Sequence, residues 1–136
     1  MDYEEIFNMS YWRVFGVTVG DNPFAETMYG QFLYHPEIAA KFTAGDPGKP
    51  MQMLRVSVTL AASYYFNRKP DHLLVKFAAQ HSRSRLGIEP RLYRHWLDSV
   101  LLAVKAHDPK CDENVLEAWR RILTPAIEFM RSKYDA

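Results

Sequence analysis

The chain has 136 residues, a length that suits one compact domain. Hydrophobic residues make up 48% of it and aromatic residues 14%, which is more apolar material than a disordered segment carries. Its 17 basic and 16 acidic residues leave a formal charge of +1, which disfavours nucleic acid and anionic membranes as partners. The composition therefore predicts a folded, soluble protein with one domain over residues 1–136.

The cysteine content and the N-terminal segment favour a cytoplasmic location. The single cysteine, Cys111, cannot form an internal disulfide or a thiolate metal cluster, which fits a reducing compartment. The first residues are acidic and lack the basic and then apolar layout of a targeting signal. No apolar run approaches the roughly 18 residues that a membrane helix requires. We therefore expect no membrane association.

The apolar pattern is helical throughout, whereas the alternation of strands bounded by hairpin turns is missing. Gly20 to Pro23, His35-Pro36 and the Gly- and Pro-rich stretch 43–49 are the helix stops of the first half. Pro125 is expected to kink the last helix. The pattern predicts an all-α fold, with helices near residues 4–19, 23–34, 37–42, 50–66, 71–82, 90–107 and 112–134.

One of the five histidines lies on an apolar helix face. His81 follows Phe77 by one turn, whereas turn, helix-end or polar-face positions account for the other four, which are His35, His72, His95 and His107. A lone imidazole cannot chelate a bare ion, but it can be an axial ligand when a porphyrin supplies four nitrogens. No HxxxH, CxxC or HExxH spacing supports zinc. His81 is therefore either a hydrogen-bonded core histidine or a haem ligand.

Three segments resemble those of a known family. The first is Gln31–Phe42, in which a proline and a phenylalanine are six residues apart; the second is Val75–His81; the third carries the IxPxxY signature at Ile88, Pro90 and Tyr93. In order and spacing over about residues 22–131 they resemble globins, in particular bacterial single-domain globins and the haem domain of flavohaemoglobins. The resemblance implies a globin fold, a helical sandwich around one haem, with His81 as the ligand of the iron.

The resemblance also implies a set of haem-pocket residues. Phe42 corresponds to the phenylalanine that stacks on the porphyrin, and Gln52 to the distal glutamine that donates a hydrogen bond to bound gas. Val56 follows Gln52 by one turn and limits the space above the iron. Arg83 and Arg85 could pair with the haem propionates. The pocket residues expected in addition are Arg55, Phe77, Ile88, Tyr93 and Trp96.

Two features depart from the family pattern. The position that corresponds to the distal tyrosine of bacterial globins is occupied by Met28 in this chain, and Tyr29 is the next residue. Either side chain could therefore face the iron. Tyr93 matches the tyrosine that helps to anchor the proximal histidine in flavohaemoglobins, but the partner glutamate would fall near Ala136, where the chain has no carboxylate. The resemblance thus does not extend to a strongly basic, peroxidase-like imidazole.

The resemblance leaves the biological role open between several classes. Reversible binding of oxygen or another diatomic gas, such as nitric oxide or carbon monoxide, is the leading hypothesis. Nitric oxide dioxygenation is the enzymatic alternative, and it would need an external reductase because no GxGxxG run is present. Gas or redox sensing through a partner is a second alternative. The aromatic residues Tyr3, Tyr11 and Trp12 suggest a contact face for it, and with it a homodimer. A globin-like bundle without haem is the third alternative.

Overall fold

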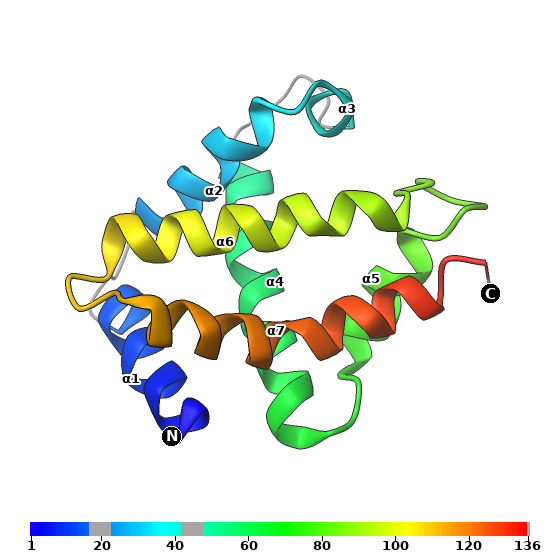
Figure 1. Ribbon diagram of the computed structural model, residues 1–136. Coiled ribbons are helices and arrows are strands. Elements are labelled where there is room, and N and C mark those ends of the chain that lie inside the picture. Colours follow the sequence, from blue (N-terminus) through cyan, green and yellow to red (C-terminus); the bar gives the residue numbers. More distant parts are fainter. Residues whose placement is uncertain (17–22, 42–47, 136) are drawn as a thin grey trace.

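The computed structural model describes residues 1–16, 23–41 and 48–135, and these residues form helices without a strand (Figure 1). The all-α prediction is confirmed. The helices are α1 Tyr3–Phe15, α2 Pro23–Leu33, α3 Pro36–Ala39, α4 Gly48–Asn67, α5 His72–Gln80, the short 3-10 helix η1 Pro90–Leu92, α6 Tyr93–His107 and α7 Glu113–Ser132.

The helices begin where side chains or prolines suit a first turn. Asp2, Asp71 and Asp112 precede α1, α5 and α7, and each carboxylate accepts a hydrogen bond from a backbone N–H of its helix. Such caps satisfy N–H groups that have no partner inside the helix. Pro36 and Pro90 begin α3 and η1, because proline has no N–H to leave unpaired there.

The helices pack in crossed layers. Figure 1 shows α6 in yellow and α7 in orange side by side, with α4 crossing behind both. Helix α2 packs on α6 and α4, and α1 packs on α7. The core between them is aromatic: Trp119 is fully buried, and its ring centroid lies 4.7 Å from that of Phe7 and 6.0 Å from that of Phe24. This core holds α1, α2 and α7 together.

The end of α5 differs from the sequence prediction. The helix ends at Gln80 instead of Ser82, so His81 is the residue that follows it. The chain then folds back, since Leu86 N–H donates to the Gln80 carbonyl at 3.0 Å and Gly87 N–H donates to the Ser82 carbonyl at 2.9 Å. Gly87 has φ 62°, a conformation that glycine adopts without steric cost. This turn fixes the backbone on which His81 sits.

Candidate functional site

A cavity of about 1090 Å³, counting the part that is open to solvent, lies between the helices. Most of its lining is apolar, and α2 to α7 all contribute to it. An apolar cavity with a few polar groups is the usual form of a small-molecule site. The lining residues are Phe32, Ile38, Lys41, Pro50, Met53, Leu54, Ser57, Leu60, Ala61, Leu74, Phe77, His81, Ile88, Leu92, Tyr93, Trp96, Ala126, Ile127 and Met130.

His81 lines this cavity, and its Nε2 has no hydrogen-bond partner among the described residues. Its Nδ1 lies 2.7 Å from the Phe77 carbonyl oxygen, and because a carbonyl only accepts, Nδ1 carries the proton and donates. Burial lowers the pKa of His81 and outweighs the opposite effect of this hydrogen bond. The imidazole is therefore neutral at pH 7, and Nε2 keeps a lone pair. A histidine in this state is ready to bind a metal through Nε2.

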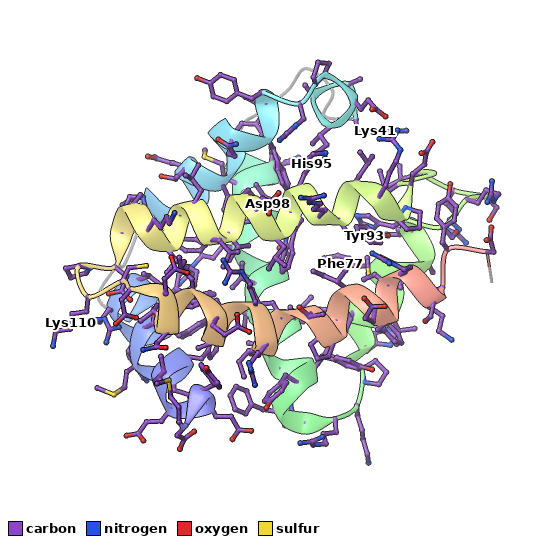
Figure 2. All side chains as sticks on the ribbon, viewed as in Figure 1. Lys41, Phe77, Tyr93, His95, Asp98 and Lys110 are labelled. Atoms are coloured by element: carbon purple, nitrogen blue, oxygen red, sulfur yellow. The ribbon has the colours of Figure 1, made fainter. Side chains whose placement is uncertain are left out.

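Tyr93 brings a buried hydroxyl to the same cavity. Its ring centroid lies 6.5 Å from that of His81, and its Oη is buried with no hydrogen-bond partner among the described residues. Burial, together with the nearby Tyr134, raises the pKa of Tyr93 to about 12, so the hydroxyl stays protonated at neutral pH. Figure 2 shows Phe77 and Tyr93 in the space framed by α6 and α7. The cavity thus contains an unused donor and acceptor.

A second polar group joins the walls formed by α4 and α6. Trp96 Nε1 donates to Ser57 Oγ at 2.9 Å, and Ser57 Oγ donates to the Leu54 carbonyl at 2.6 Å. Both hydrogen bonds fix Ser57 at the cavity lining. The pair is one of the few polar points on a mostly apolar surface.

Lys41 carries the one permanent charge among the described residues of the lining. It is exposed and lies after α3, and its Nζ donates to the Leu86 carbonyl at 3.4 Å (Figure 2). Leu86 belongs to the turn that follows α5, so this long hydrogen bond links the segment after α3 to that turn. A cation at this position suits a ligand with an anionic end.

Five of the predicted pocket residues lie together in the cavity lining. They are Phe77, His81, Ile88, Tyr93 and Trp96, contributed by α5, the turn after it and α6. Phe42 lies outside the described residues. The other predicted residues with described positions do not line the cavity.

The structure differs from the sequence expectation along α4. Gln52 is exposed, and neither Gln52 nor Val56 lines the cavity, whereas Met53 and Ser57 do. One residue along an α-helix turns a side chain by about 100°, so a shift of one position replaces the expected pair by the pair that follows it. Arg55 is directed to α1, where its guanidinium carbon lies 5.5 Å from the centroid of the Phe15 ring.

The other predicted residues also lie elsewhere. Neither Met28, which is fully buried, nor the half-buried Tyr29 lines the cavity, and α2 contributes Phe32 instead. Arg85 is exposed and outside the lining. Arg83 pairs with Asp135 at 2.6 Å.

Sequence reasoning missed three functional candidates, Lys41, Met53 and Ser57. The apolar residues of α4 lie on several of its faces, so the pattern does not indicate which face lines the cavity. Met53 and Ser57 therefore could not be distinguished from their neighbours. Lys41 precedes Phe42 directly, and that position is the one signal that could have pointed to it.

The described residues contain neither a membrane-spanning helix nor a cluster of metal-binding side chains. No described helix is long and apolar enough to cross a membrane. Within the same residues, no group of three or more histidine, cysteine, aspartate or glutamate side chains could hold a metal ion.

The comparisons with known proteins found a similar solved structure. A protein from Pseudomonas aeruginosa PAO1 matches with a TM-score of 0.86 and 32% sequence identity, over 99% of this chain and 100% of that one. Its crystal structure is described as structurally highly homologous to a human hemoglobin. No protein-family model and no curated protein matches the chain.

Proposed function

This chain belongs to the globin family, and on that premise we propose that it binds one haem through His81 and takes up a diatomic gas reversibly. One observation carries the proposal: His81 lines an apolar cavity with Nε2 unpaired among the described residues, while Nδ1 donates to the Phe77 carbonyl. This arrangement supplies a single neutral nitrogen ligand, which is what a porphyrin-bound iron requires from a protein.

The cavity also suits the rest of a haem. The cavity takes lining residues from α2 to α7 and is partly open to solvent, an arrangement that suits a cofactor held between the helices with one edge exposed. The apolar lining suits the macrocycle, and the exposed Lys41 offers a cation for the carboxylates at its edge. The residues present therefore fit the group.

Bound haem would supply an iron with a coordination position for gas. The protein's own contribution is then to hold the cofactor and to control what reaches it. His81 would bind the metal in a fixed tautomer, because the Phe77 carbonyl holds the proton on Nδ1. The apolar lining would exclude water, and its polar groups would select among gases.

The proposal is tested by absorption spectroscopy of the haem-free protein titrated with haem. We expect a sharp Soret band at one haem per chain, which shifts when the reduced protein takes up carbon monoxide. His81→Ala should lose the wild-type band, and added imidazole should restore it in His81→Gly. His95→Ala is the matched control, because that ring lies 3.9 Å from His35 and outside the cavity lining.

Two results would contradict the proposal. One is a wild-type protein whose mixture with haem shows only the broad absorption of free haem. The other is a His81→Ala variant whose spectrum matches that of the wild type, since the metal would then have a different ligand.

A further inference from the structure

The polar pair of Ser57 and Trp96 is the feature of the cavity that the binding of a cofactor does not explain. We propose that Ser57, held in place by Trp96, donates the hydrogen bond that stabilises gas taken up in this cavity. The family resemblance gave this role to Gln52 or to a distal tyrosine. The inference rests on the proposed function, because it concerns gas bound at the same site.

The other hydrogen-bond donors are placed for other tasks. Gln52 is exposed, and Tyr29 is absent from the cavity lining. Lys41 is exposed and donates to the Leu86 carbonyl, while the Tyr93 ring lies beside His81, on the metal-ligand side. Among the described lining residues, Ser57 and Trp96 are the donors that remain.

The hydrogen bond from Trp96 sets the direction of the serine proton. An indole N–H can only donate, so Ser57 Oγ must accept from Trp96 Nε1, at 2.9 Å. The hydroxyl therefore has its one proton to give elsewhere, and in this structure it goes to the Leu54 carbonyl at 2.6 Å. That carbonyl lies inside α4 and also accepts from the helix backbone.

The serine proton can consequently turn to a guest at low cost. When the hydroxyl leaves the Leu54 carbonyl, the carbonyl keeps its helical partner and the oxygen of Ser57 keeps the bond from Trp96. A donor in an apolar cavity is stronger than one in water. It favours a gas that accumulates negative charge on its outer atom, which oxygen does more than carbon monoxide.

The test compares gas release from haem-loaded wild type, Ser57→Ala, Ser57→Thr and Gln52→Leu. We expect Ser57→Ala to release oxygen about fivefold faster, the effect of one net hydrogen bond. Carbon monoxide release should change much less, and the infrared stretching band of bound carbon monoxide should move. Ser57→Thr keeps a hydroxyl and should retain the wild-type oxygen rate.

Ser63→Ala is the matched control, since Ser63 lies in the same helix outside the cavity lining, where it accepts from Asn67 Nδ2. We expect wild-type rates from it. The inference is overturned if loaded Ser57→Ala releases oxygen at the wild-type rate, or if Gln52→Leu alone speeds release. A wild type that forms no Soret band would instead reject the proposed function, so the two failures are distinguishable.

Discussion

At the scale of single residues, Tyr93 offers a direct test of the cavity. Its hydroxyl is buried and has no partner among the described residues, and such a group carries a desolvation cost in the haem-free protein. Tyr93→Phe should therefore raise the free energy of unfolding of the haem-free protein, by about 1 kcal/mol. Urea titration followed by circular dichroism measures the change.

The control for Tyr93 is Tyr65, whose hydroxyl donates to Glu4 Oε1 at 2.9 Å on an exposed part of the surface. Tyr65→Phe removes a solvated hydrogen bond and should change stability by less than about 0.5 kcal/mol. If Tyr93→Phe destabilises the haem-free protein instead, the hydroxyl has a hydrogen-bond partner in solution.

The sequence predicted some cavity residues and missed others for a physical reason. Phe77 and Tyr93 lie on helices with one apolar face, and His81 directly follows the first of these helices, so the period of the pattern indicates the side that is buried. The pattern of α4 has apolar residues on several faces, and a shift of one position exchanges Gln52 for Met53. The role proposed for Ser57 depends on Trp96, which lies 39 positions away and enters only through the fold.

At the scale of elements, α5 is the shortest of the three helices that begin with a capping aspartate. It has nine residues, of which Leu74 and Ala78 are buried. Short helices are marginal without tertiary packing, so the Asp71 cap should matter. Asp71→Ala should cost about 1 kcal/mol and speed amide exchange across the whole of α5. Hydrogen exchange with mass spectrometry measures the rate for each peptide.

The matching control is Asp112→Ala, which removes the same kind of cap from α7. That helix has 20 residues and several fully buried side chains, Trp119 among them, so the added exchange should stay within its first turn. Equal effects throughout both helices would show that packing does not decide how far the loss of a cap spreads.

Element boundaries were predictable where a single residue type sets them. Pro36 begins α3, and Asp71 and Asp112 are the caps of α5 and α7, which agrees with the sequence analysis to within one or two residues. The end of α5 was less predictable, because it is set by hydrogen bonds from Leu86 and Gly87 that form only after the chain has folded back.

At the scale of the whole molecule, one buried polar network joins the two ends of the chain. Ser10 Oγ donates to Asp108 Oδ2 at 2.6 Å, and Trp119 Nε1 donates to Ser10 Oγ at 2.9 Å. Arg13 adds hydrogen bonds of 2.6 and 2.9 Å to the same carboxylate. The network links α1, the α6–α7 corner and α7, across separations of about 100 residues that sequence patterns do not reveal.

Asp108 is the centre of this network, and its charge should set the acid stability of the protein. Burial opposes its ionisation, but hydrogen bonds from Arg13, Ser10 and the Lys110 N–H outweigh burial, so the pKa of Asp108 lies below its ordinary value. A carboxyl with a lowered pKa stabilises the fold fully above its unfolded pKa, about 3.9, and loses that contribution as the pH falls through its folded pKa.

Asp108→Asn should consequently cost about 3 kcal/mol at pH 7, because it leaves the partly buried Arg13 without its counter-charge. The difference in unfolding free energy between wild type and variant should shrink below about pH 4, because the carboxyl then takes up a proton in the unfolded wild type and, at lower pH, in the folded one as well. Urea unfolding at pH 7, 5 and 3 measures it, with Ser10→Ala as the control that keeps the ion pair. A difference as large at pH 3 as at pH 7 would mean that the shape of the side chain, and not its charge, holds the helices together.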